Sequence, residues 1–207
     1  MARILLVRHG QAAASFTDDA DPGLDKLGID QARAVADQLR SNLPLLLISS
    51  PLKRARETAA PLLQMQVDAL SSESIRIDTS HVETLPLETL HIETLHIETR
   101  MSEIPSPGLS LSDRGAWLGQ VMQGQWSEQS GSLSEWRTDL ISCLNEQQQD
   151  CVIFTHFVAI NVAVGYAEGN DQVSIFRPGN TSITELVTDG ESLTLAKRGE
   201  QAVSIVN

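Results

Sequence analysis

Residues 3–10 read RILLVRHG, and this short stretch carries most of what the chain reveals about its fold. Its apolar run, Ile4–Val7, is typical of a buried strand in a parallel sheet. Ligands of open α/β sheets bind beyond the carboxyl ends of the strands, so we expect Arg8 and His9 at a crevice and not in the core. Gly10 fits a sharp turn whose backbone conformation excludes a Cβ atom.

An imidazole beside a guanidinium suits phosphoryl transfer. Neutral His9 can attack phosphorus and form a phosphohistidine while Arg8 binds the phosphate oxygens. The triplet alone is equally compatible with a strand that merely ends in polar residues, so other segments must decide between the two interpretations.

Two further apolar runs end in polar residues of the same kind. LLLISS at 45–50 precedes Pro51, and the Ser-Pro pair predicts a helix from Pro51 to about Met65 whose free N–H groups point at the same crevice. Arg54 lies about one turn into that helix. The third run, 151–155, ends in His156, which can hydrogen-bond a phosphoryl oxygen as charge builds in the transition state.

Taken in order, these segments resemble the histidine phosphatase superfamily, the phosphoglycerate-mutase-like proteins. The strand followed by RHG corresponds to residues 3–10, an LxxLGxxQA stretch is present at 24–32, and SSPLxRAxxTA is nearly verbatim at 49–59. A strand that ends in His is present at 155–156, and residues 180–183 also look like the family. These matches cover most of the chain.

The resemblance implies the site residues. His9 would be the nucleophile, Arg8 and Arg54 the phosphate arginines, and His156 a further phosphate ligand. The family also uses an acidic residue as proton donor to the leaving alcohol, and Glu103 lies in a similar local pattern. A shifted alignment would replace it with one of the upstream glutamates, which are Glu83, Glu88, Glu93 and Glu98.

Three features depart from the family pattern. Gln11 stands where many relatives carry Glu, and Gln11 or loop N–H groups could supply that contact to phosphate. Phe157 follows His156 where Gly is usual, and its ring would line the pocket. The third departure is a repeat at about 81–99, where HVETL, PLETL, HIETL and HIET follow one another.

The repeat has a period of five residues, which fits neither a helix face nor a simple strand. The leading interpretation is an insertion that forms a flap beside the pocket or an arm that pairs with another subunit. A metal site at His81, His91 and His96 is disfavoured by their spacing. Likewise Asp18, Asp19 and Asp21 are interpreted as a solvated loop and not as a cation site.

Composition limits the remaining possibilities. With 207 residues, 41% hydrophobic, the chain suits a single domain spanning 1–207, and no apolar run approaches the roughly 20 residues of a membrane helix. No signal peptide is visible, and Cys143 and Cys151 show no disulfide pattern, so a cytoplasmic location is expected. The net charge of −12 argues against nucleic-acid or anionic-membrane partners. The oligomeric state is left open.

Alternating strands and helices predict a three-layer α/β/α sandwich with a mostly parallel sheet. The expected helices begin at Gly28 (to about Asn42), Pro51, about Ser112, about Ser134 and Val158 (to Tyr166). We expect buried faces at Ile29, Ala32, Val35, Ala36 and Leu39, at Trp117, Leu118, Val121 and Met122, and at Trp136, Leu140 and Leu144. Additional strands are expected at Ser74–Asp78 and in a hairpin, Ser182–Val187 and Ser192–Ala196, around Asp189-Gly190.

The expected activity is hydrolysis of a phosphomonoester, on a small phosphorylated metabolite or a phosphoprotein, without metal or other cofactor. A cofactor-dependent phosphoglycerate mutase shares such a site and is the alternative. A non-catalytic module that binds phosphorylated ligands is the alternative from another class, since a fold resemblance does not determine function.

Overall fold

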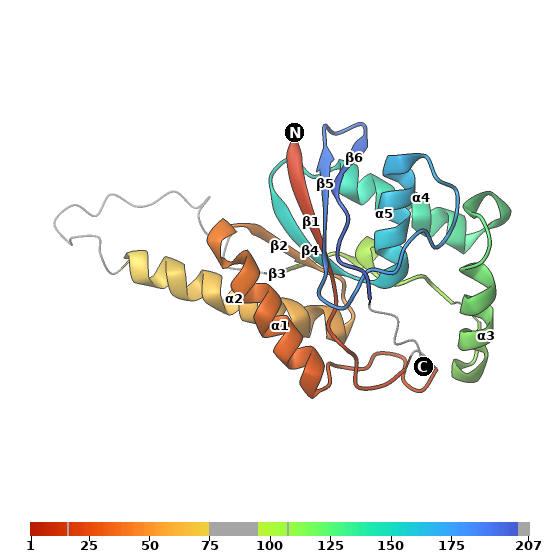
Figure 1. The fold of residues 1–207 in the computed structure, drawn as a ribbon, viewed down its shortest axis with the longest axis horizontal. Coiled ribbons are helices and arrows are strands. Elements are labelled where there is room, and N and C mark those ends of the chain that lie inside the picture. The colour runs from red at the N-terminus through yellow and green to blue at the C-terminus, as the bar shows by residue number, and fades with distance from the viewer. Residues whose placement is uncertain (16, 75–94, 107, 203–207) are drawn as a thin grey trace.

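The computed structural model describes residues 1–15, 17–74, 95–106 and 108–202. Six strands form one sheet in the order β3-β2-β4-β1-β5-β6 (Figure 1). The first four run parallel to one another, while β5 is antiparallel to both of its neighbours. The strands are β1 (Ala2–Arg8), β2 (Leu46–Ser49), β3 (Leu95–Ile97), β4 (Cys151–Thr155), β5 (Ile183–Thr188) and β6 (Leu193–Lys197). The expected mostly parallel sheet is confirmed.

Helices cover both faces of the sheet. In β1, Ile4 and Leu6 belong to the core on the side of α4 and α5, whereas Leu5 and Val7 belong to the core on the side of α1 and α2. Figure 1 shows these two helical layers, with α3 beside them at the end of the molecule. The helices are α1 (Lys26–Leu39), α2 (Lys53–Ser74), α3 (Leu111–Val121), α4 (Ser132–Asn145) and α5 (Phe157–Glu168). The three-layer α/β/α sandwich is therefore confirmed.

The centre of the sandwich is formed by β4 and the helix that follows it. Every residue of β4 is buried, because parallel neighbours flank the strand and helices cover both of its faces. Burial of a side chain such as Phe154 contributes roughly 1.5–3 kcal/mol to stability. This apolar centre holds the carboxyl ends of β1, β2 and β4 in fixed register.

Helix α1 differs from its expected form at its start. It begins at Lys26, where the Asp25 side chain caps it by accepting a hydrogen bond from Gly28 N–H. Ile29 is 43% exposed, so its assignment to the buried face was wrong. Gly28 is buried in its place, because a Cβ atom there would lie 2.1 Å from the Gln11 carbonyl oxygen. The remaining four residues of the expected face are buried.

Helix α2 is longer than expected and reaches Ser74. One cause is Gln66, which is buried and bonds both backbone groups of Leu45, so the helix continues past Met65 against the start of β2. The expected strand was wrong at Ser74, which is helical, and its other residues, 75–78, lie outside the described residues.

The end of the pentapeptide repeat is the edge strand of the sheet. Leu95–Ile97 forms β3, which pairs parallel to β2 with Leu47 opposite Leu95 and Ser49 opposite Ile97. The statement that the repeat fits no strand is therefore wrong for these residues, because pairing with β2 outweighs the local pattern. Residues 81–94, and with them His81 and His91, lie outside the described residues.

The remaining elements agree with expectation except at α3. Trp136, Leu140 and Leu144 of α4 are buried, and the β5–β6 hairpin turns at Gly190, whose φ is +98°. In α3 only Val121 of the expected face is buried, since this helix packs loosely beside the sandwich. Among the described residues no helix is long and apolar enough to cross a membrane, and no group of three or more His, Cys, Asp or Glu side chains could hold a metal ion.

Candidate active site

The carboxyl ends of three parallel strands meet at one edge of the sheet. Arg8 in β1 pairs with Thr155 in β4, and Ser49 in β2 pairs with Phe154, so the residues that follow each strand are neighbours. His9 N–H donates to the Thr155 carbonyl (2.9 Å), and Ser50 N–H donates to the Phe154 carbonyl (3.0 Å). The sheet itself therefore brings together His9, Ser50 and His156.

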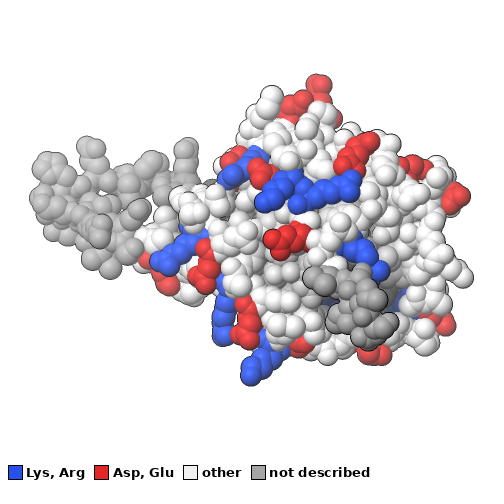
Figure 2. All heavy atoms as spheres, viewed as in Figure 1, with Lys and Arg blue, Asp and Glu red and all other residues white. Residues whose placement is uncertain are grey.

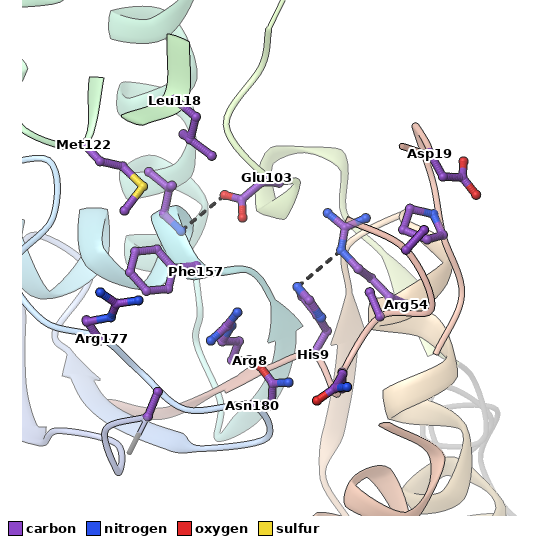
Figure 3. Close-up of a pocket in the computed structure, with 16 residues that line it drawn as sticks. Arg8, His9, Asp19, Arg54, Glu103, Leu118, Met122, Phe157, Arg177 and Asn180 are labelled. Atoms are coloured by element: carbon purple, nitrogen blue, oxygen red, sulfur yellow. Dashed lines mark hydrogen bonds between the residues drawn. The ribbon is translucent and has the colours of Figure 1, made fainter. Parts of the chain in front are cut away.

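A cavity of about 450 Å³ opens above these strand ends (Figure 3). A volume of this size suits a small metabolite. Its polar lining is Arg8, His9, Gln11, Asp19, Arg54, Glu103, Arg177 and Asn180. Its apolar lining is Ala12, Ala14, Pro22, Leu118, Met122, Phe157, Val158 and Ala202. Leu118 and Met122 thus face the pocket, where the sequence had suggested core positions.

His9 is held as a neutral imidazole in the floor of the pocket. The residue is 8% exposed, and its Nδ1 lies 2.7 Å from the Gly10 carbonyl oxygen, which can only accept, so Nδ1 carries the proton. Arg54 Nε–H donates to Nε2 (3.2 Å). Burial, with the Arg54 charge, lowers the pKa of His9 to about 3. The lone pair on Nε2 is consequently available at neutral pH.

The backbone around His9 is fixed by contacts with α1 and α2. Gly10 N–H donates to the Thr58 hydroxyl (3.0 Å), and that hydroxyl donates to the Arg54 carbonyl (2.7 Å). A Cβ atom on Gly10 would lie 2.7 Å from the Gly28 carbonyl oxygen. Glycine is therefore required here by the close approach of α1, and the expected reason, a special turn conformation, is replaced by a packing reason.

Arg54 is buried beside His9, with 6% of its surface exposed. Asp21 lies next to it: one carboxylate oxygen accepts a hydrogen bond from Lys53 N–H (2.8 Å) and is 3.9 Å from Arg54 Nη1. Helix α2 begins at Lys53, two residues later than expected, and the Asp21 carboxylate accepts the hydrogen bond of its first N–H group. Asp21 is thus more than part of a solvated loop.

Arg8 is oriented by the loop before β5 and by α5. Its Nη1 donates to the Pro178 carbonyl (2.8 Å), and its guanidinium carbon lies 5.3 Å from the centroid of the Phe157 ring. This distance is typical of a cation–π contact. Phe157, which replaces the usual Gly, lines the pocket as expected and also supports Arg8.

His156 lies directly behind His9, and the two ring centroids are 5.1 Å apart. The residue is fully buried and does not line the cavity. Nε2 is 2.7 Å from the Ser50 hydroxyl oxygen, while Nδ1 has no hydrogen-bond partner among the described residues. Burial lowers the pKa of His156 well below its usual value, so this second imidazole is also neutral.

Glu103 lies in the wall of the pocket at the start of α5. One carboxylate oxygen accepts from Ile104 N–H (3.0 Å) and from Val158 N–H (3.2 Å), the second of which is drawn in Figure 3. Burial raises the pKa of Glu103, against the opposing effect of these N–H groups and the arginines. A raised pKa favours the protonated carboxyl group that a general acid needs.

The alternative acids are placed differently. Hydrogen bonds from Arg100 lower the pKa of Glu98, and the same Arg100 also pairs with Glu146, so Glu98 is held as a carboxylate away from the cavity lining. Glu83, Glu88 and Glu93 lie outside the described residues.

Gln11 lies at the margin of the same cavity. Its side-chain amide donates to an Asp25 carboxylate oxygen (2.9 Å), and its own N–H donates to the Gln31 side chain (2.8 Å). These contacts hold Gln11 toward α1, so a contact to phosphate requires its second amide proton.

Part of the chain matches a known protein family. The model of the histidine phosphatase superfamily, branch 1, matches residues 4–102. This range is just under half of the chain, and over it the sequence resembles that superfamily. The matched range contains Arg8, His9 and Arg54 and ends directly before Glu103.

Three proteins similar to this chain are named as phosphatases. A glucosyl-3-phosphoglycerate phosphatase of Mycolicibacterium vanbaalenii is 37% identical over 81 residues, which is 37% of this chain and 34% of that protein. The match thus spans about a third of that relative's length. The fold is shared with a mycobacterial glucosyl-3-phosphoglycerate phosphatase (TM-score 0.64, 21% identity, 98% of this chain and 100% of that chain). It is also shared with a phosphoserine phosphatase from Entamoeba histolytica (TM-score 0.63, 18% identity, 97% of this chain and 98% of that chain).

Some residues at the pocket were missed from the sequence. Arg177 lines the cavity from the loop before β5, and no local pattern marks it. Asn180, in the stretch 180–183 that resembles the family, also lines the cavity, although no role was assigned to it. Asn161 is fully buried in α5 and accepts hydrogen bonds from Ile175 N–H and Phe176 N–H (2.8 and 3.1 Å). A lone amide in the apolar run 158–164 was a signal that could have found it.

Proposed function

We propose that this protein hydrolyses phosphomonoesters through a phosphohistidine on His9. One observation carries the proposal: the proton of His9 is on Nδ1, and the lone pair of Nε2 lies beside the Arg54 guanidinium in a cavity that Arg8 and Glu103 also line. A nucleophile, two phosphate-binding cations and a general acid are thereby gathered around one space of metabolite size.

In the first step the phosphate dianion binds between Arg8 and Arg54. The hydrogen bond that Arg54 Nε–H donates to His9 Nε2 is then donated to a phosphate oxygen instead. Nε2 of His9 attacks phosphorus, the N–P bond forms, and the bond from phosphorus to the ester oxygen breaks. Protonated Glu103 gives its proton to the departing oxygen, so a neutral alcohol leaves. The Nδ1 proton of His9 stays with the Gly10 carbonyl. His156, which was expected to bind phosphate, packs behind the His9 ring and does not line the cavity, so it is not assigned a contact to the phosphoryl group.

The second step returns the enzyme to its starting state. Glu103, now a carboxylate, takes a proton from water, and the resulting hydroxide attacks phosphorus. The N–P bond breaks, its electron pair returns to Nε2, and inorganic phosphate leaves. This sequence needs no metal, because the guanidinium groups compensate the charge that builds on the phosphoryl oxygens.

The substrate class follows from the cavity and from the names of the relatives. Those names specify glucosyl-3-phosphoglycerate and phosphoserine, which are small phosphomonoesters. We propose a small metabolite of this kind, since a cavity of about 450 Å³ leaves little room for a folded phosphoprotein segment. Figure 2 shows basic side chains gathered in a short band on the face drawn, with acidic side chains next to them.

Two further expectations remain part of this proposal. We propose a single domain, because one sheet takes its strands from residues 2 to 197. We also propose a reducing, cytoplasmic location, which is supported by Cys143 and Cys151, both free and buried.

The decisive experiment follows the phosphoenzyme. Wild-type protein quenched in base during turnover of a ³²P-labelled phosphomonoester should carry an acid-labile, base-stable label, and His9→Ala should carry none. The same change should reduce phosphate release to background, whereas Arg33→Gln on the exposed side of α1 should leave it intact. Label on another residue, or turnover that survives His9→Ala, would overturn the proposal.

The mutase alternative is separated in the same assay. With 3-phosphoglycerate and a bisphosphoglycerate primer, a phosphatase releases inorganic phosphate, and a mutase yields 2-phosphoglycerate with little release. A binding module would retain the ligand without either reaction. Activity that persists with a chelator is the expected result for a site that operates without metal.

A further inference from the structure

Arg177 is an arginine in the pocket for which the proposed reaction has no use. It lines the cavity and is exposed, whereas Arg8 and Arg54 already serve the phosphate. In Figure 3 its guanidinium lies at the opposite end of the pocket from Arg54, with Arg8 drawn between them. No ion pair joins it to an acidic side chain in the described part of the chain. Among the residues that the structure describes, this cation of the pocket therefore forms no ion pair.

The loop that carries Arg177 is fixed on three sides. The buried Asn161 accepts the N–H groups of Ile175 and Phe176, which are the two residues before it. Pro178 directly follows Arg177, and its carbonyl oxygen accepts a hydrogen bond from Arg8 Nη1. The Arg177 carbonyl itself accepts from Ala202 N–H (2.9 Å). A backbone held this firmly presents the side chain at a defined place, which is what selective recognition needs.

One wall of the pocket is apolar. It is formed by Leu118 of α3, by Met122 directly after that helix and by Phe157 of α5, and Figure 3 shows them on the same side of the pocket as Arg177. Such a wall suits a carbon skeleton that connects the phosphate to a second polar group.

We propose that Arg177 recognises a carboxylate on the substrate, so that the preferred substrates are phosphomonoesters of small hydroxy acids. This inference rests on the proposed function for the position of the phosphate at His9. The guanidinium group of Arg177 can donate two parallel hydrogen bonds to the two oxygens of a carboxylate, and its single positive charge balances the single negative charge of that carboxylate. A second phosphate dianion would meet a single cation here, unlike the pair that serves the first phosphate at the His9 end.

The test uses two substrates that differ only in the proposed group. In 3-phosphoglycerate the carbon opposite the phosphate is a carboxylate, and in glycerol 3-phosphate it is a hydroxymethyl group. Wild-type protein should prefer 3-phosphoglycerate in kcat/KM. In Arg177→Gln the ratio of the two values should fall roughly 10- to 100-fold, the equivalent of one hydrogen-bonded charge pair. Arg177→Lys should keep part of the preference, and Arg33→Gln, which removes an exposed arginine of α1, should keep all of it.

A binding measurement separates this inference from the proposed function. In the His9→Ala background, where no turnover is expected, titration calorimetry compares the affinity for 3-phosphoglycerate with and without Arg177→Gln. A loss confined to the carboxylate ligand supports the role of Arg177 even if the phosphohistidine mechanism fails. An unchanged ratio of the two kcat/KM values, or equal losses of affinity for 3-phosphoglycerate and glycerol 3-phosphate, would overturn the role of Arg177. A larger loss for 2,3-bisphosphoglycerate than for 3-phosphoglycerate would also overturn it, because the second anion would then be a phosphoryl group.

Discussion

Protonation at the scale of single residues decides what this pocket does. Burial lowers the pKa of His9 and raises the pKa of Glu103, so it shifts the nucleophile and the acid in opposite directions. For an imidazole the charged form is the protonated one, and for a carboxyl group it is the deprotonated one. A single dry environment thereby prepares both the nucleophile and the proton donor.

Glu103→Gln should separate protonation of the leaving group from attack by His9. We expect kcat/KM for an alkyl phosphate to fall roughly 10²- to 10⁴-fold, because the alcohol then leaves without a proton. An aryl phosphate with a stable phenolate leaving group should still phosphorylate His9 and give a burst of one equivalent of phenol. Stopped-flow absorbance measures that burst.

Glu98→Gln is the matched control, since Glu98 was an alternative acid and is engaged by Arg100. A larger loss in Glu98→Gln than in Glu103→Gln would show that the acid is misassigned. The pH profile adds a second readout: the general acid must hold its proton, so kcat/KM should decline as pH rises through the elevated pKa of Glu103. That decline should be absent in Glu103→Gln.

At the scale of elements, α5 organises the pocket. His156 precedes its first residue, Val158 N–H holds Glu103, and Phe157 supports Arg8. One turn further, Asn161 anchors the loop of Arg177. The same helix therefore positions groups of the reaction and the residue we assign to selectivity.

Asn161→Ala should weaken both stability and selectivity. The change leaves Ile175 N–H and Phe176 N–H without their acceptor, and each buried orphan donor costs about 1–3 kcal/mol, so we expect a loss of roughly 2–4 kcal/mol in the free energy of unfolding. Urea denaturation measures this loss, and the ratio of kcat/KM for the two glycerol-derived substrates measures the displacement of Arg177.

Asn170→Ala provides the comparison. It removes a similar bond from an amide oxygen to a backbone N–H, that of Gln172, at an exposed site, and should cost well under half as much. Equal losses in the two variants would argue against an anchoring role for Asn161. A loss of stability with unchanged selectivity in Asn161→Ala would show that Asn161 of α5 does not position Arg177.

At the scale of the whole molecule, the active site carries a stability cost that depends on pH. The fold holds His9 and His156 neutral, and their pKa values are far below those of exposed histidine. Below the usual histidine pKa of about 6.5, the unfolded chain binds protons that the folded chain does not. Stability is therefore present at neutral pH and declines as pH falls below this value, for His9 down to about 3.

We expect His9 alone to remove on the order of 2–4 kcal/mol of stability between pH 7 and pH 4. Urea midpoints of wild type and His9→Gln at both pH values measure this contribution, together with the effect of His9 on the pKa of its neighbour His156. His9→Gln should lose less stability on acidification than wild type. Glu103, whose pKa is raised, adds stability as pH falls, which is opposite to the effect of His9. Glu103→Gln should therefore lose more stability on acidification than wild type. A pH response identical in wild type and His9→Gln would contradict the prediction.

The apolar runs before Arg8, Ser50 and His156 were sufficient to predict the parallel strands, because buried parallel strands need continuous apolar residues and present polar groups only where they end. Helix positions on amphipathic segments were also predictable, as Ala32, Val35, Ala36 and Leu39 show. Boundaries were less so: α2 extended to Ser74 because buried Gln66 bonds the backbone of Leu45, a contact between distant residues that no local pattern contains.

By itself, the sequence determined the architecture, the strand ends that carry Arg8, His9 and His156, and the helix start that carries Arg54. These depend on local patterns of apolar and polar residues. Only the tertiary structure decided that β3 pairs with β2, that Glu103 and not Glu98 lines the cavity, and that Arg177 faces it. Each of these depends on which distant segments meet and on how much water remains between them. Burial and long-range hydrogen bonds set those outcomes, and both exist only once the chain is folded.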